Sequence, residues 1–222
     1  MPENLVLIQK NIAALLAEIP PHVTLVAACK TRSVAEVEAA YAAGLRHFGH
    51  NYVQEAQTML PQLGFQADWH LIGHLQRNKA AEAVQIFQMV ETMDSLHLAQ
   101  ELEKRCGQQD KILPVLIEIN SGYEESKSGT LPEEVDDLVQ GICELPHLRV
   151  EGLMTMGPRS GNAQEARPYF QTTRQIFERL STLKIPNLNL HILSMGMSDS
   201  YRVAIDEGAT MIRLGNVIFG KR

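Results

Sequence analysis

Short apolar runs and amphipathic stretches alternate along the chain. In the opening stretch, apolar residues recur at helical spacing up to Pro20, where the helix that they predict must stop. The run 24–29 is continuously apolar, as expected of a strand that is buried on both faces. Ser33, with Glu36 three residues later, predicts the start of a helix that ends near Gly44.

The same alternation continues to the end of the chain. Each later apolar run is followed by a stretch with helical spacing, and the helices with the clearest predicted bounds are 78–85 and 198–207. This pattern makes about eight strands, nearly all separated by helices. The further predicted strands are 47–51, 69–73, 87–93, 112–120, 150–156, 190–195 and 211–214.

Strands that alternate with helices predict a parallel sheet with right-handed crossovers. Hairpin signals such as Asn-Gly between strands are missing. About eight such units in 222 residues favour an α/β fold of the closed (β/α)8 TIM-barrel type, in which the extra N-terminal helix takes the ring position after the last strand. A doubly wound open sheet is the structural alternative. Because no linker or repeat divides the sequence, we expect a single domain over residues 1–222.

Composition narrows the class of protein. A hydrophobic content of 45% with 21% charged residues is typical of a soluble globular protein, and a net charge of −6 argues against a nucleic-acid partner. Cys29, Cys106 and Cys143 form no C-x-x-C pair, so we expect free thiols in a reducing compartment. The sequence shows neither a signal-peptide pattern nor a run of roughly 20 apolar residues, which favours a cytoplasmic protein without a membrane span.

Polar residues gather where the predicted strands end. Active sites of α/β barrels lie at this C-terminal face, so these side chains are candidates for a common site. The candidates, with the two residues that follow the last strand, are Lys30, Asn51, His74, Asn120, Ser194, Ser198, Arg213, Gly215 and Asn216.

Lys30 carries the clearest chemistry of this set. It directly follows a buried strand, and apolar walls around its stem would disfavour the charged ammonium form. A neutral lysine amine attacks aldehydes, so Lys30 is a candidate for an imine with a carbonyl ligand. The alternative is a lysine at a strand end that extends its ammonium group into solvent.

The segments 194–200 (SMGMSDS) and 213–216 (RLGN) form a candidate anion site. Ser198 is placed to cap the helix that follows it, leaving N–H groups directed outward, and barrels often bind phosphate after their last two strands. Two tight turns without any ligand are the alternative. His74 could stack on a planar ligand or could be purely structural.

Arg213 could bind a phosphate through two hydrogen bonds or donate to an aromatic ring nitrogen. An arginine opposite a pyridine nitrogen keeps that nitrogen unprotonated, which weakens the ring as an electron sink. The alternative is a surface salt bridge with Asp206 or Glu207. The scattered histidines show no metal-ligand pattern, so we expect no metal site.

Six segments together resemble the pyridoxal phosphate homeostasis protein family. They are AACKT around Lys30, AAGLRHFGHNYVQEA (42–56), WHLIGHLQRNK (69–79), EGLMTMG (151–157), LSMGMSDSY (193–201) and IRLGNVIFG (212–220). The resemblance covers most of the chain from about residue 23 onward and implies a barrel that binds pyridoxal 5′-phosphate (PLP), of fold type III, related to the N-terminal domain of alanine racemase.

The same resemblance implies a role for each candidate. Lys30 would form the internal aldimine with PLP, and Arg213 would face the pyridine nitrogen. Ser198, Gly215 and Asn216 would take the phosphate, while the pocket would be lined by Asn51, His74, Met154 and Ser194. The sequence departs from the family pattern in two places, with His50 where glutamate is usual and Asn216 where threonine or serine is frequent.

The family resemblance implies a non-catalytic PLP carrier or buffer that influences amino-acid and keto-acid balance. PLP-dependent apo-enzymes are candidate acceptors, and without a heptad seam or second domain we expect a monomer. The alternatives are a PLP-dependent racemase and a PLP-free, aldolase-like enzyme that forms a Schiff base. A racemase needs an opposing tyrosine base, usually supplied by a second domain, and only Lys30 is evident here as a base.

Overall fold

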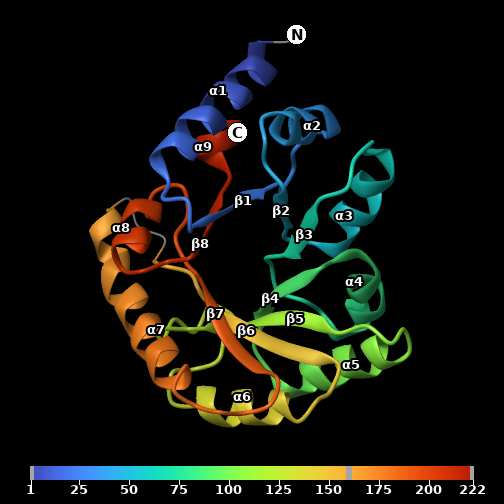
Figure 1. Cartoon of the computed structure of the whole chain (residues 1–222), viewed down its shortest axis with the longest axis vertical. Helices are drawn as coiled ribbons and strands as arrows, with labels where there is room; N and C mark the ends of the chain where they lie inside the picture. Colours follow the sequence, from blue (N-terminus) through green and yellow to red (C-terminus); the bar gives the residue numbers. More distant parts are fainter. Residues whose placement is uncertain (1–2, 159–161, 221–222) are drawn as a thin grey trace.

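The computed structural model describes residues 3–158 and 162–220. Within these residues the fold is a closed barrel of eight parallel strands, each hydrogen-bonded to its sequence neighbours, with β8 pairing back to β1. Figure 1 shows the strands around the centre and the helices outside them. The strands are β1 (Thr24–Ala28), β2 (His47–His50), β3 (Asp68–Leu71), β4 (Met89–Met93), β5 (Leu113–Ile119), β6 (Leu148–Thr155), β7 (Leu188–Ser194) and β8 (Met211–Leu214).

Helices or helical turns follow the strands and form the outer ring. The predicted TIM barrel is therefore confirmed, and the open sheet is excluded by the β1–β8 pairing. The helices are α1 (Glu3–Glu18), α2 (Val34–Ala42), α3 (Val53–Met59), α4 (Ala80–Ile86), α5 (Leu96–Gly107), α6 (Val135–Cys143), α7 (Arg167–Leu180), α8 (Tyr201–Asp206) and α9 (Asn216–Phe219), with 3-10 turns at Leu60–Gln62, Arg77–Lys79 and Ala163–Ala166.

Helix α1 occupies the ring position after β8, as the sequence predicts. It packs beside α2 and α9, and Figure 1 shows the blue α1 next to the red α9. The side-chain amide of Asn11 donates a hydrogen bond of 3.0 Å to the carbonyl oxygen of Ile218. At its other end, Glu18 accepts a hydrogen bond of 3.0 Å from the hydroxyl of Tyr201. Helix α1 thus packs against α9, the helix that follows β8.

The core has two parts. One lies between the strands and the helices, and the other fills the barrel interior, because its members come from six different strands. The interior cluster is Val26, Met89, Leu116, Met154, Ile192 and Met211. Polar side chains of His70, Glu91, Glu118, Ser194 and Arg213 are also almost completely buried. The barrel is therefore a packed core rather than a pore.

Several predicted bounds were wrong by one or more residues. The strand predicted to begin at residue 87 begins at Met89, because the Phe87 amide still donates to the carbonyl of Ala83 at the end of α4. The helix predicted over 78–85 is a 3-10 turn, Arg77–Lys79, followed by α4. The helix predicted over 198–207 is the shorter α8, preceded by Ser200 rather than Ser198.

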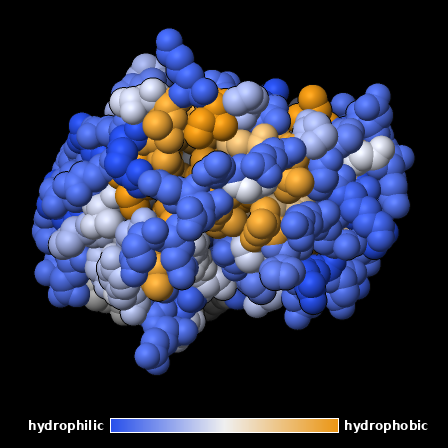
Figure 2. Space-filling view, turned by 90° about the horizontal axis from the view of Figure 1, so that it is seen from below, coloured by the Kyte–Doolittle hydropathy of each residue, from blue (hydrophilic) through white to orange (hydrophobic). Residues whose placement is uncertain are grey.

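The molecular surface shown in Figure 2 is mostly hydrophilic, with hydrophobic side chains gathered near the centre of that face. Such a cover is what amphipathic helices produce when their apolar sides face the barrel. Among the described residues, none of the helices combines the length and apolar character needed to cross a membrane. The single domain expected over 1–222 stays a prediction, and its residues 1–2, 159–161 and 221–222 lie outside the described part.

Candidate functional site

Lys30 stands just beyond the C-terminal end of β1. The chain turns sharply there, because the amide of Arg32 donates to the carbonyl of Cys29 at 3.0 Å. Thr31 has a φ of 59°, a conformation that a β-branched residue rarely adopts and that marks local backbone strain. Lys30 is half-buried, and its Nζ lies 5.3 Å from the centroid of the Tyr52 ring. The turn therefore places Lys30 at the C-terminal mouth of the barrel, directly after β1.

Arg213 of β8 extends into the barrel interior and is only 5% exposed. Its Nη1 donates to Oγ of Ser194 at 2.5 Å, and its Nη2 donates to the carbonyl oxygen of Thr155 at 3.0 Å. The alternative of a surface salt bridge with Asp206 or Glu207 was wrong, because Arg167 pairs with both of those carboxylates. Burial lowers the pKa of Arg213, and nearby carboxylates oppose this shift.

Two glutamates near Arg213 were missed by the sequence reasoning. Glu91, on β4, has no exposed surface, and its Oε2 accepts a hydrogen bond of 2.7 Å from Ser194 and lies 3.8 Å from Nη1 of Arg213. Its Oε1 lies 2.7 Å from Nδ1 of His70. Burial disfavours the charged form of Glu91, but the hydrogen bond from His70 and the charge of Arg213 outweigh it and hold its pKa below the usual value.

Glu118, on β5, is the second of these glutamates and is 2% exposed. Its Oε2 has no hydrogen-bond partner among the described residues. Burial and the neighbouring Asp94 raise the pKa of Glu118 to about 7, although Arg213 acts in the opposite direction. The signal that could have found both glutamates is a charged residue inside an otherwise apolar strand, as in MVETM and VLIEI.

Ser198 joins the loops that follow β7 and β8. Its Oγ accepts hydrogen bonds of 3.4 Å from the amides of Gly215 and Val217. The predicted capping role of Ser198 was wrong, because α8 begins after Ser200 and the amides of Ser200 and Tyr201 are bonded to the carbonyl of Met197. One hydroxyl and two backbone N–H groups nevertheless meet at this point. Asn216 follows directly as the first residue of α9.

Asn51 and His74 lie together on the far side of the barrel mouth. Both line a cavity of about 270 Å³. The side chain of His74 is 55% exposed, and its Nδ1 lies 3.3 Å from Oδ2 of Asp94. Gly73 packs tightly here, since a Cβ on it would lie 2.4 Å from the carbonyl oxygen of Asn51. Asn120, which the sequence placed at the end of β5, instead bonds its own loop through the backbone of Glu124.

Met154 and Ser194 are neighbours in the register of β6 and β7, and both are fully buried. The structure therefore forms three groups from the predicted residues. Arg213 contacts Ser194 beside Met154, Ser198 contacts Gly215, and Asn51 shares a cavity with His74. Lys30 follows β1, the strand that pairs directly with β8.

His50, where the sequence departs from the family pattern, lies at the end of β2 with no exposed surface. Its ring stacks on Trp69 with centroids 5.6 Å apart, and its Nδ1 is 3.9 Å from Oε2 of Glu55. Burial lowers the pKa of His50 to about 4, so the ring is neutral at neutral pH. A neutral, stacked imidazole therefore directly precedes Asn51 in the chain.

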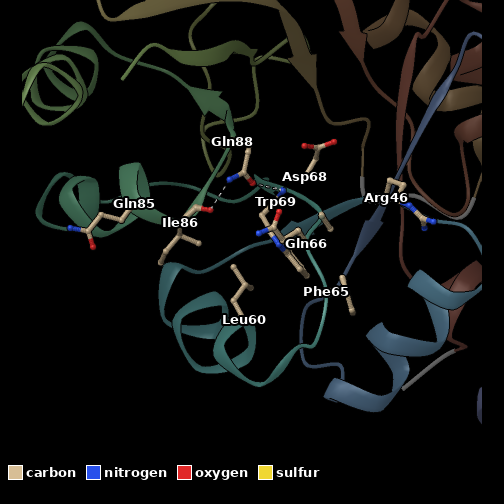
Figure 3. Close-up of a pocket in the computed structure, with 10 residues that line it drawn as sticks. Arg46, Leu60, Phe65, Gln66, Asp68, Trp69, Gln85, Ile86 and Gln88 are labelled. Atoms are coloured by element: carbon tan, nitrogen blue, oxygen red, sulfur yellow. Dashed lines mark hydrogen bonds between the residues drawn. The ribbon is translucent and has the colours of Figure 1, made fainter. Parts of the chain in front are cut away.

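A further hollow lies at the opposite end of the barrel. A groove of about 750 Å³, shown in Figure 3, is lined by the segments leading into β3 and β4, including Phe65, Asp68 and Gln88. These are N-terminal strand ends, whereas Lys30 and Arg213 approach the C-terminal mouth. In the described part of the chain, no cluster of three or more His, Cys, Asp or Glu side chains could hold a metal ion.

A family model described as the N-terminal domain of alanine racemase matches residues 4–222. The pyridoxal phosphate homeostasis protein of Haemophilus influenzae is 38% identical over 225 residues, which cover 99% of this chain and 94% of that protein. The chain belongs to the pyridoxal phosphate homeostasis protein family. The relative from Aquifex aeolicus, which has the same name, is also 38% identical, over 89% of this chain and 86% of its own length.

Solved structures agree with membership of the pyridoxal phosphate homeostasis protein family. PipY of Synechococcus elongatus, solved with PLP bound, superposes with a TM-score of 0.88 at 34% identity, covering 96% of this chain and all of PipY. Alanine racemase of Corynebacterium glutamicum has a TM-score of 0.78 at 18% identity, covering 98% of this chain and 62% of the racemase. The second similarity shows the shared barrel fold alone.

Proposed function

We propose that this chain binds PLP covalently through Lys30 and serves as an intracellular carrier or buffer of the cofactor. One observation carries the proposal. An amine, a buried guanidinium group and a cluster of hydroxyl and N–H donors come from the ends of three strands that are adjacent in the barrel, β1, β8 and β7. PipY, a relative at 34% identity, has been solved with PLP bound.

The residues present fit three groups of PLP: its aldehyde, its pyridine nitrogen and its phosphate. The Lys30 amine can condense with the aldehyde and release one water. Arg213 supplies a donor for the pyridine nitrogen, and its place inside the barrel is fixed by Ser194. Ser198, Gly215 and Asn216, with the backbone N–H groups around them, would hold the phosphate. Asn51, His74 and Met154 would surround the ring.

Arg213 also supports a role without substantial catalysis. Bound PLP supplies an electron sink for carbanions when its ring nitrogen is protonated. A guanidinium group in place of a carboxylate keeps that nitrogen unprotonated, so the sink is weak. Curated relatives are named homeostasis proteins, which agrees with this proposal. We expect Lys30-dependent exchange of the amino-acid Cα hydrogen to be slower than about 1 per second, the low end of ordinary turnover.

The proposal includes a cellular compartment and an oligomeric state. Cys29, Cys106 and Cys143 are buried free thiols, which suits a reducing cytoplasm. We propose a monomer that supplies PLP to PLP-dependent apo-enzymes and thereby influences amino-acid and keto-acid balance. Size-exclusion chromatography with light scattering measures the oligomeric state directly.

The test is an absorbance spectrum of the chain incubated with PLP, before and after borohydride reduction. The wild type should acquire a visible imine band that borohydride bleaches, and Lys30→Ala should lose most of it. Lys104→Ala, a change at an exposed position on α5, is the matched control and should keep the band. A wild-type protein that stays colourless with PLP would defeat the proposal.

A further inference from the structure

A chain of hydrogen-bonded side chains crosses the barrel from its N-terminal mouth to Arg213. His47 Nδ1 lies 3.4 Å from His70 Nε2, and His70 Nδ1 lies 2.7 Å from Glu91 Oε1. Ser194 then links Glu91 to Arg213, with distances of 2.7 Å and 2.5 Å on its two sides. The five residues belong to β2, β3, β4, β7 and β8, so they span the interior.

From this chain we propose that Glu91 is the positioning residue for Arg213, fixing its guanidinium group and balancing its charge beside the cofactor ring. The inference rests on the proposed function, because it assigns a role within the same PLP site. Glu91 accepts a hydrogen bond from Ser194, and Ser194 accepts one from Arg213. It acts through Arg213 rather than by touching the cofactor.

The directions of the hydrogen bonds support this role. Ser194 has one hydroxyl proton, which it gives to Glu91, and its oxygen accepts from Arg213. Because Glu91 is an acceptor when ionised, His70 must donate to it from Nδ1. Donors thus approach both carboxylate oxygens of Glu91 from opposite ends of the barrel. A carboxylate bonded at both oxygens holds one orientation, and it fixes Ser194 and Arg213 with it.

The buried charges of Arg213 and Glu91 also support the positioning role of Glu91. Arg213 and Glu91 are both buried, and their charged atoms are 3.8 Å apart. Among the described residues, two further titratable groups act on the pair: His70 acts on Glu91, and Glu118 acts on Arg213. Glu118 has a pKa of about 7, so near neutral pH it is only partly ionised. Glu91 is therefore the permanent counter-charge that keeps the guanidinium group from imposing a full positive charge on the ring.

The imine pKa of the PLP-loaded protein measures this effect, because a proton on the imine nitrogen responds to charge nearby. Visible spectra recorded from low to high pH give that pKa. Glu91→Gln removes the negative charge and should lower the imine pKa by about one unit. Arg213→Gln removes the positive charge and should raise it. The double variant, which buries no unbalanced charge from this pair, should return to within a few tenths of the wild type.

His191→Gln is the control. His191 lines the cavity of about 310 Å³ at the N-terminal mouth with His47 and His70, but the contacts of its ring are with the Asn189 carbonyl and, at 3.9 Å, with Oε2 of Glu151. Its imine pKa should equal that of the wild type. If Glu91→Gln does not fold, Arg213→Gln and the double variant still decide. An unchanged imine pKa in Glu91→Gln, or a double variant that keeps the Arg213→Gln shift, overturns the inference. Absence of any imine band in the wild type would instead defeat the proposed function.

Discussion

The Nη1 atom of Arg213 donates a hydrogen bond of 2.5 Å to the Oγ atom of Ser194 inside the barrel. The same hydroxyl donates to Glu91 at 2.7 Å, so a single serine links a buried cation to a buried anion. Neither partner can turn to water when the serine is lost, since Glu91 has no exposed surface and Arg213 is 5% exposed. Loss of the Ser194 hydroxyl would therefore remove one hydrogen-bond partner from each buried charge.

Ser194→Ala should lower the free energy of unfolding by about 1–3 kcal/mol, because buried charged groups lose a hydrogen-bond partner. Urea unfolding of the protein without PLP measures this cost. Ser181→Ala is the control, since the Ser181 hydroxyl is exposed and bonds only the carbonyl of Phe177. Its effect should stay within about 0.5 kcal/mol. Equal stability of the two variants would show that the Ser194 link is dispensable.

Ser198→Ala should weaken PLP binding about tenfold while changing the free energy of unfolding little. The reason is that a hydrogen bond to a charged phosphate contributes more free energy than the two bonds of 3.4 Å that Ser198 makes here. Equilibrium titration with PLP, followed by the visible band, measures the affinity. Ser200→Ala is the matched change in the same loop, where the hydroxyl bonds only the Met197 amide. Loss of affinity in both variants would point to the loop as a whole.

Gly73→Ala should destabilise the protein by roughly 1–3 kcal/mol and weaken PLP binding, because the added methyl group would meet the backbone of Asn51 and force the loop after β2 to move. Gly64→Ala is the control, since no atom lies within 4 Å of its added methyl group. Thermal unfolding and PLP titration of both variants measure the two effects. Gly73→Ala with unchanged affinity would separate Asn51 from the cofactor site.

Glu118→Gln should stabilise the protein at alkaline pH. The carboxyl titrates near pH 7 in the folded protein and near 4.5 in the reference state, so folding favours its protonated form. That contribution is present below about pH 4.5 and is lost as the pH rises through 7. The variant should therefore gain up to about 3 kcal/mol over the wild type at pH 8 and little at pH 5. Urea unfolding at both pH values measures the difference, and a gain independent of pH would contradict the assignment.

The barrel could be predicted from the sequence because several strands, such as β1 and β5, are buried on both faces and appear as largely continuous apolar runs. Lys30, Asn51 and Arg213 could be identified as candidates because polar residues at strand ends break that pattern. The capping role of Ser198 could not be judged in the same way. Each of the three serines in SMGMSDS can cap a helix. Ser198 instead bonds the amides of Gly215 and Val217, which follow β8 and lie far from it in the sequence.

The interior glutamates were hidden for a different reason. A charged residue within an apolar run argues against a buried strand at that position. In addition, the partner of such a residue lies on a strand that is far away in the sequence. Glu91 precedes Ser194 by 103 residues. Only the closed barrel brings the two together, and the sequence alone therefore gave no reason to connect Glu91 with Arg213.

The most direct test of the central claim is peptide mass mapping of the PLP-treated chain after borohydride reduction. The reduced pyridoxyl phosphate group should be found on the peptide that contains Lys30, and Lys30→Ala should carry none. A pyridoxyl mass on another lysine of the wild type, or on no peptide at all, would contradict the assignment of Lys30 as the residue that holds PLP.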